Sequence, residues 1–194
     1  MNDPVYLKPR NGKEMMYAIK EGNGRGGPIP ICMYSDICRN VEKYGAVRTL
    51  QLLNKMGERV LILLQDPLNM RTGHWMSLSF YPLDKTIYFF SSYGGKPDEE
   101  KNRWIDVAAR FSSGQARNAL NDGLKELHKL GWTIHYNDYP FQKEGDNSAT
   151  CGIWTAAFLN LGLNPDDFYK YVKKSHLTYK DFYNAFFKRT RKTY

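Results

Sequence analysis

The stretch Phe141–Leu161 constrains this chain more than any other, because a polar, glycine-containing loop leads there directly into an apolar run. Asn147 or Ser148 can cap a helix at this point, so the pattern predicts a helix that begins near Cys151. Unpaired backbone N–H groups and the positive end of the helix dipole favour a thiolate over a thiol at such a start. Cys151 is therefore a candidate nucleophile, although this stretch alone fits a small buried thiol even better.

The composition predicts a single globular domain that covers residues 1–194. With 42% hydrophobic and 25% charged residues, a chain of 194 residues can bury a substantial core. Its longest apolar runs, such as Val60–Leu64, are too short to cross a bilayer. The first residues lack the basic and apolar layout of a signal peptide, so we expect an intracellular protein without membrane association.

The three cysteines are an odd number, which argues against a disulfide framework and for reduced thiols. Cys32 and Cys38 have no histidine or second cysteine pair at the spacing of a zinc site. We therefore expect that the protein requires no metal and no cofactor.

The net charge of +8 at pH 7 indicates attraction to a polyanion such as nucleic acid. The basic residues are spread along the chain, and residues 188–192 form its one compact basic run. Such a run is more often a solvated end than a binding site. Both interpretations stay open at this point.

Hydrophobic periodicity and turn residues predict helices combined with short strands. Helices are expected at about residues 35–44, 46–56, 98–111 and 116–130, from Cys151 to Gly162, from Pro165 and from Thr178. Strands are expected at 59–65, 74–81, 87–92 and 132–137, with the middle two joined as a hairpin. Residues 1–30, which contain a cluster of glycines and prolines, are expected to form an irregular arm. The predicted fold class is α+β, with a small mixed central sheet and flanking helices.

One of the four histidines stands out as a candidate base. His128, His135 and His176 occupy positions that we expect at the surface. His74 differs, because it opens a strand directly after a glycine-ended loop and precedes Trp75. A histidine at a strand edge is held rigidly and can still meet a partner. A half-buried, hydrogen-bonded histidine without catalytic work fits the spacing equally well.

Three motifs in this order carry a resemblance to a known group of enzymes. They are Gly73–Met76 at a strand start, Phe90–Gly95 at the end of the hairpin, and Asn147–Gly152 before the helix. The order resembles that of the adenovirus maturation protease and of the SUMO-type deconjugating cysteine proteases. The segment from Thr72 to Gly95 is also similar to proteases encoded by virophages and Maverick-type transposons. The resemblance covers roughly residues 59–162.

The resemblance implies a papain-like cysteine protease fold of the adenain/Ulp type and a set of site residues. Cys151 would be the nucleophile and His74 the general base. The Cys151 amide and the Gln142 side chain would stabilise the oxyanion. Trp75 and Gly152 would bind substrate, with Trp75 lining a narrow channel for small residues.

This sequence departs from the pattern of that group at two positions. Ser91 stands where the group has an Asp, Asn or Glu that orients the histidine. Either the enzyme works as a Cys–His dyad, or a backbone carbonyl or Asn137 takes that role, or the site is degenerate. Gln142 lies nine residues before Cys151, whereas the group places its Gln six or seven residues before, and Glu144 occupies the seventh position.

The implied function is cleavage of viral capsid and structural precursor proteins during virion maturation, at glycine-containing sites. The protein would then act in the virion and in the cytoplasm of the infected host cell. DNA, bound through the basic charge, or a peptide would be its activator. One alternative is an isopeptidase for ubiquitin-like modifiers. Another is a catalytically degenerate virion protein that binds nucleic acid.

Overall fold

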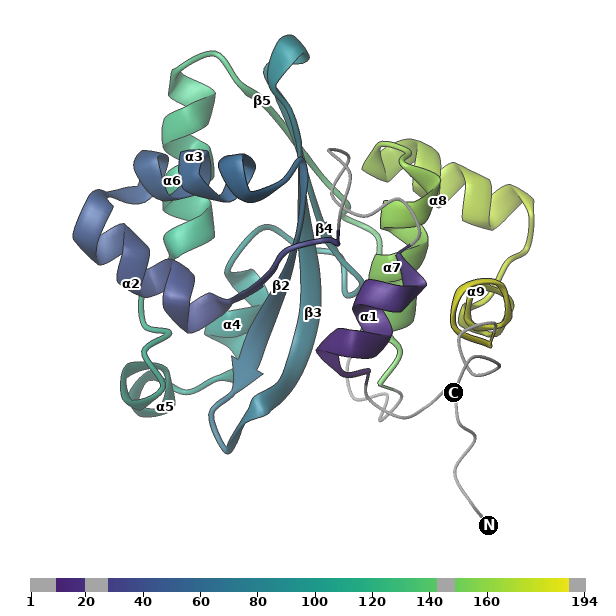
Figure 1. Ribbon diagram of the computed structural model, residues 1–194, viewed down its shortest axis with the longest axis horizontal. Coiled ribbons are helices and arrows are strands. Elements are labelled where there is room, and N and C mark those ends of the chain that lie inside the picture. Colours follow the sequence, from purple (N-terminus) through teal and green to yellow (C-terminus); the bar gives the residue numbers. More distant parts are fainter. Residues whose placement is uncertain (1–9, 20–27, 143–148, 189–194) are drawn as a thin grey trace.

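The computed structural model describes residues 10–19, 28–142 and 149–188 (Figure 1). Its centre is a mixed five-stranded sheet with the spatial order β1-β2-β3-β4-β5. The strands are β1 Ile31–Met33, β2 Arg59–Asp66, β3 Asn69–Tyr81, β4 Thr86–Ser91 and β5 Thr133–Tyr136. The middle three strands pair antiparallel, while β1 and β5 run parallel to their neighbours. The predicted α+β class with a mixed sheet is confirmed.

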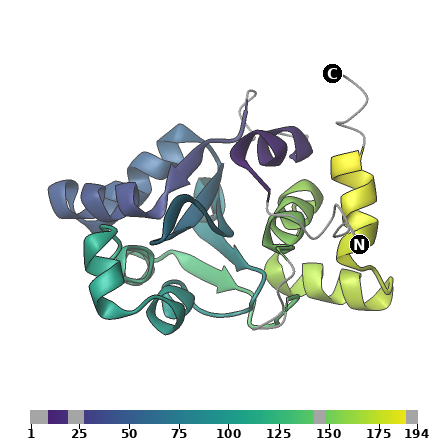
Figure 2. The same ribbon diagram turned by 90° about the horizontal axis from the view of Figure 1, so that it is seen from below.

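Side-chain alternation along the strands divides the core between the two faces of the sheet. On one face, Val60 and Ile62 of β2 pack with α2 (Tyr34–Tyr44), α3 (Ala46–Met56) and α6 (Ala119–Lys129). On the other face, Leu61 and Leu63 of the same strand pack with the N-terminal and C-terminal helices. These are α1 (Gly12–Ala18), α7 (Cys151–Leu161), α8 (Pro165–Lys174), α9 (Tyr179–Phe182) and the π-helical turn Tyr183–Phe187. Figure 2 shows the same two layers from a second direction.

Helix α7 is buried on all sides, from Cys151 to Leu159, between the sheet and the other helices of its layer. The Thr155 Oγ1 hydroxyl donates a hydrogen bond of 3.1 Å to the backbone carbonyl of Trp75, which ties α7 to β3. The ring of Phe158 stacks on Phe90 of β4 at 4.5 Å. The N-cap is Thr150, without a side-chain cap bond, while the predicted caps Asn147 and Ser148 lie outside the described residues.

The expectation of an irregular arm over residues 1–30 is wrong for Gly12–Ala18, which form helix α1. Asn11 and Glu14 make a capping box at its start, a local signal that the glycine-rich stretch after it obscured. Met15 and Ala18 are fully buried, so α1 belongs to the core. Residues 1–9 and 20–27 of the expected arm lie outside the described residues.

The single helix expected over 98–111 is two helices, α4 (Glu99–Trp104) and α5 (Val107–Ser112). The break occurs because Asp106 leaves helical geometry and its side chain accepts a hydrogen bond from the amide of Ala109, which starts a new helix. Strand β1 was not predicted. No helix in the described ranges combines the length and the apolarity that spanning a bilayer requires.

We expect Phe158→Ala to lower the free energy of unfolding by about 3–5 kcal/mol, because it removes a buried ring that packs against other aromatic rings and leaves a cavity. Phe158 is 2% exposed, whereas Phe111 is 71% exposed and offers a matched control. Phe111→Ala should change stability by less than about 0.5 kcal/mol. Urea unfolding followed by circular dichroism measures both. Equal losses in the two variants would contradict this description of the core.

Candidate active site

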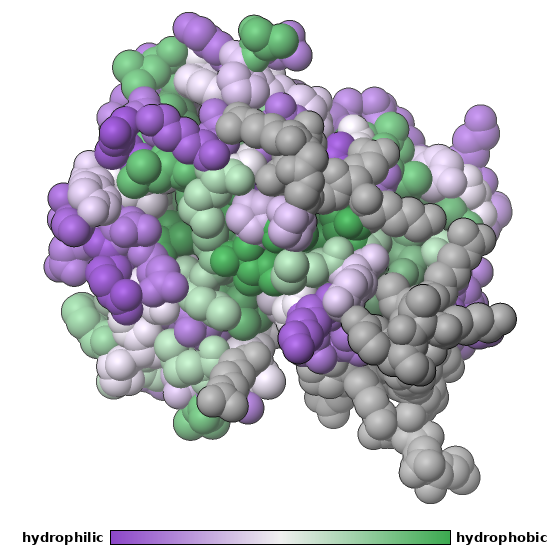
Figure 3. All heavy atoms as spheres, in the orientation of Figure 1, coloured by the Kyte–Doolittle hydropathy of each residue, from purple (hydrophilic) through white to green (hydrophobic). Residues whose placement is uncertain are grey.

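A cleft of about 530 Å³ opens where the N-terminus of α7 meets β3. Cys151, His74 and Gln142 line it together with aromatic side chains from three parts of the chain, Trp75, Tyr93 and Trp104. In the space-filling view the surface is notched between the β2–β3 hairpin and the N-terminal segment (Figure 3). The fold therefore brings together residues as far apart in the sequence as His74 and Cys151.

Cys151 is the first residue of α7, and it is buried beside His74. Burial alone would raise the pKa of the Cys151 thiol. The hydrogen bond and the charge of His74, followed by backbone hydrogen bonds from Trp75 and Gly152, outweigh burial and lower this pKa below its usual value. The Cys151 thiol therefore loses its proton at a lower pH than the thiol of a free cysteine does.

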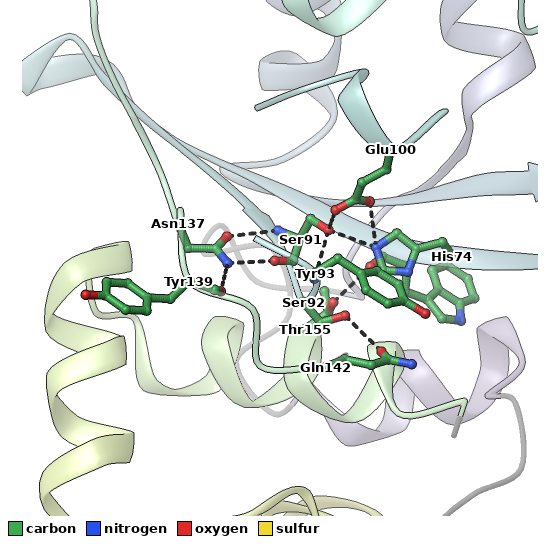
Figure 4. A network of polar contacts seen from close by, with 10 residues as sticks. His74, Ser91, Ser92, Tyr93, Glu100, Asn137, Tyr139, Gln142 and Thr155 are labelled. Atoms are coloured by element: carbon green, nitrogen blue, oxygen red, sulfur yellow. Dashed lines mark hydrogen bonds and ion pairs between the residues drawn. The ribbon is translucent and has the colours of Figure 1, made fainter. Parts of the chain in front are cut away.

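His74 on β3 meets two oxygen-bearing side chains through one ring nitrogen, as Figure 4 shows. Its Nε2 lies 2.9 Å from Ser91 Oγ and 3.1 Å from Glu100 Oε2. Burial alone would lower the pKa of His74, but the Glu100 carboxylate and the interactions with Cys151 raise it to about 10. The imidazole is therefore held as a cation at neutral pH, next to a thiol whose pKa is lowered.

Glu100 is a site residue that the sequence analysis missed. It lies in the first turn of α4, where an acid is also expected for its favourable interaction with the helix dipole. Its side chain is buried, and it accepts a short hydrogen bond from Ser91 Oγ–H. The usable signal was an acid nine residues after Ser91, in a helix that begins directly after the glycine turn closing the hairpin.

Ser91 occupies the end of β4, opposite Met76 in the register with β3. Asn137 holds its backbone from both sides, with Oδ1 accepting from Ser91 N–H at 3.1 Å and Nδ2 donating to Ser91 C=O at 2.7 Å. Asn137 also donates to the carbonyl of Tyr139 at 3.1 Å. Asn137 thus contacts the serine backbone, and Glu100 is the carboxylate beside His74.

Gln142 lines the same cleft as Cys151 despite its unusual spacing in the sequence. Two contacts with Ser92 fix it: its backbone N–H donates to the Ser92 carbonyl at 3.0 Å, and its Oε1 accepts from Ser92 Oγ–H at 3.1 Å. Because Oε1 faces Ser92, the donating end of the amide faces away from that serine. Glu144, the residue at the spacing that the resemblance implies, lies outside the described residues.

Trp75 and Gly152 both contact the N-terminal segment. The Trp75 ring is buried, and its Nε1–H donates to the carbonyl of Arg10 at 2.9 Å. A Cβ added to Gly152 would lie 2.9 Å from Met15 Sδ and 3.1 Å from Arg10 Cβ. Glycine at this position therefore permits the close approach of the N-terminal segment to the nucleophile helix.

The remaining histidines are exposed, as predicted: His128, His135 and His176. Within the described residues, no group of His, Cys, Asp and Glu has the arrangement of a metal site.

Solved structures of the SUMO protease Ulp1 are among the structural matches of this chain. The form with its catalytic cysteine oxidised to a sulfinic acid has a TM-score of 0.42 and 16% identity, covering 81% of this chain and 68% of that chain. The C-terminal Ulp1 protease domain in complex with Smt3, the yeast ortholog of SUMO, has a TM-score of 0.42 and 15% identity, covering 81% and 67%.

No protein-family model matches this chain. It is 39% identical over 102 residues to the uncharacterized protein V9 of Sputnik virophage, covering 52% of this chain and 54% of that protein. It is 29% identical over 96 residues to the protease of Bovine adenovirus 2, covering 49% of this chain and 41% of that protein. The chain thus spans about half the length of these relatives. It is related in sequence to an adenovirus protease and to a virophage protein, as its His-Trp, hairpin and Cys-Gly motifs predict.

Proposed function

We propose that this chain is a cysteine protease in which Cys151 is the nucleophile and His74 the general base. The observation that carries the proposal is the buried pair of these two side chains in the cleft. His74 lowers the pKa of the thiol, while Glu100, followed by Cys151, raises the pKa of the imidazole. A thiolate beside an imidazolium is the reactive form of a cysteine protease.

The proposed reaction begins when the thiolate of Cys151 attacks the scissile carbonyl carbon and the carbonyl electron pair moves onto oxygen. The Cys151 amide and the Gln142 side chain donate hydrogen bonds to this oxyanion. The imidazolium of His74 gives its proton to the leaving amine as the C–N bond breaks, which leaves a thioester. Neutral His74 then takes a proton from the water that attacks the thioester, which restores the thiolate–imidazolium pair.

The substrates that we propose are viral capsid and structural precursor proteins, cut at glycine-containing sites during virion maturation. The similarity to the adenovirus protease and to the virophage protein supports this choice. Aromatic side chains line the cleft around the nucleophile, and we propose that they select residues with small side chains. The proposal places the protein in the virion and in the infected cell, where its net charge of +8 favours association with DNA.

Cleavage of the co-encoded capsid precursor tests the assignment. Cys151→Ala and His74→Ala should each remove essentially all cleavage, because each deletes one half of the reacting pair. Cys32→Ala is the matched control, since it removes a thiol outside the cleft, and it should cleave as the unaltered protein does. Gel electrophoresis of the precursor measures the extent of cleavage. Unchanged cleavage by Cys151→Ala would refute the proposal, and release of a fluorogenic SUMO-like substrate in place of precursor cleavage would favour the isopeptidase.

Alkylation by iodoacetamide at pH 6 should label Cys151 well before the other two thiols. The thiolate is the reactive form, and its population at low pH rises as the thiol pKa falls. The pKa of Cys151 is lowered, whereas burial, followed by nearby acids, raises the pKa of Cys32 and of Cys38 to about 11. Peptide mass spectrometry measures the three rates. Labelling of Cys32 or Cys38 at the rate of Cys151 would contradict the thiolate assignment.

Gln142→Ala should lower kcat by roughly 100- to 1,000-fold, because it deletes a donor to the oxyanion. The rate of Cys151 alkylation by iodoacetamide should stay within about twofold, since alkylation forms no oxyanion. Stopped-flow cleavage of a fluorogenic peptide and the alkylation rate together separate the two effects. If Gln142→Ala also lowered the rate of Cys151 alkylation, Gln142 would instead act by keeping Cys151 reactive.

A further inference from the structure

We propose that Glu100 is the acid that positions His74, and that the hydroxyl of Ser91, which contacts both side chains, assists it. This inference rests on the protease function proposed above and names a residue that acts on that site. In the group that the sequence resembles, a side chain at the end of the return strand supplies this acid. Here the strand ends in Ser91, and the carboxylate arrives from helix α4 instead.

The hydrogen bonds around Ser91 indicate that Nε2 of the His74 imidazole carries a proton. The hydroxyl of Ser91 carries one hydrogen, which it donates to Glu100 Oε1. Its oxygen accepts from the amide of Tyr93 at 3.4 Å. The contact of 2.9 Å with His74 Nε2 must then be one in which Nε2–H donates, and Glu100 Oε2 lies 3.1 Å from the same nitrogen as its ion-pair partner. With Nε2 protonated, Nδ1 is the nitrogen left to receive the proton of Cys151.

Burial makes the carboxylate effective. Glu100 is 5% exposed, His74 7% and Ser91 0%, so water screens their interaction poorly. A buried carboxylate must be paired or it loses its charge, and the imidazolium of His74 is the cation it meets. A serine hydroxyl alone accepts a hydrogen bond but cannot offset a positive charge. Glu100 supplies the charge and Ser91 fixes the distance.

Helix α4 presents two side chains to the same imidazole. Trp104 lies four positions after Glu100, on the same face of the helix. Its ring stands edge-on to His74 at 5.9 Å, and Tyr93 contacts both rings, 4.9 Å from His74 and 4.4 Å from Trp104. One short helix thus supplies the acid and part of the aromatic cover that keeps water from the pair.

Partly buried polar contacts anchor α4. The ammonium of Lys101, the residue after Glu100, donates to the carbonyl of Arg117 at 2.9 Å and to Asn118 Oδ1 at 3.2 Å. Asp98 at the start of the helix accepts from the amide of Asn121 at 2.9 Å. A rigid support of this kind is what a positioning residue needs, because catalysis depends on sub-ångström placement of the base.

The pKa of His74 agrees with this geometry, because the charge of Glu100 is the foremost influence that opposes burial and raises it. Removing that charge should lower the pKa of His74, weaken the ion pair and move thiolate formation at Cys151 to higher pH. The other titratable or charged groups that line the site are Cys151, Tyr93, Asp66 and Arg10.

The test compares Glu100→Gln with Glu99→Gln, the same chemical change one residue earlier at an exposed position. Glu100→Gln should lower kcat roughly 10- to 100-fold, the loss of one charge-assisted hydrogen bond, with KM within about twofold. It should also move the alkylation midpoint of Cys151 to higher pH, while Glu99→Gln leaves both readings unchanged. A Glu100→Gln protein with full kcat and an unshifted midpoint would overturn the inference.

A second substitution separates positioning from folding. Ser91→Asp in a Glu100→Ala background returns a carboxylate to the end of β4, and it should restore kcat roughly tenfold over Glu100→Ala alone. Absence of that recovery in a folded protein counts against the inference. Failure of the protease proposal itself is distinct, because Cys151→Ala would then leave cleavage intact.

A third test uses the Cys151→Ala protein and needs no substitution at Glu100. The ¹⁵N spectrum of its histidines should show a proton on Nε2 of His74 at neutral pH. A neutral ring protonated on Nδ1 would overturn the inference, even if Glu100 variants fail to fold.

Discussion

The site depends on how helix α7 is buried against strand β3. The hydroxyl of Thr155 bonds to the carbonyl of Trp75, and this contact sets the height of the helix on the sheet. Cys151 lies one turn before Thr155, and His74 directly precedes Trp75. Because α7 is enclosed on all sides, it has little freedom to slide or rotate. The packing of α7 against β3 therefore also determines how Cys151 and His74 are aligned.

The electrostatics of the site follow from that burial. A thiolate and an imidazolium that are largely buried need partners of opposite charge or good hydrogen bonds. Each is a partner for the other, and Glu100 with Ser91 completes the set on the far side of the imidazole. Polar contacts around Asn137 and Lys101 then hold the two elements, the end of β4 and α4, that carry this support.

The sequence predicted elements whose signals are local. Helix α3 was bounded by its apolar stripe and Gly57, and the β3–β4 hairpin by its aromatic runs. Glu100 escaped prediction because its role depends on contacts with Ser91 and His74 that form only when α4 packs beside them, and its spacing from Ser91 is a weak signal by itself. The single helix expected at 98–111 was wrong for a different, local reason, because the cap at Asp106 interrupts a continuous apolar pattern. The place of Gln142 in the cleft likewise became visible only in three dimensions.

Glycine at position 152 has a consequence for the order in which the site forms. It lets Arg10 and Met15 press against the helix that carries the nucleophile, and a bond between Asn160 and Ala18 closes the same layer across 142 positions. Contacts this distant in the chain form late, because the entropy of closing so long a loop must be offset by the rest of the core. A nascent or partly folded chain therefore carries an ordinary thiol, and reactivity arises only with the complete fold.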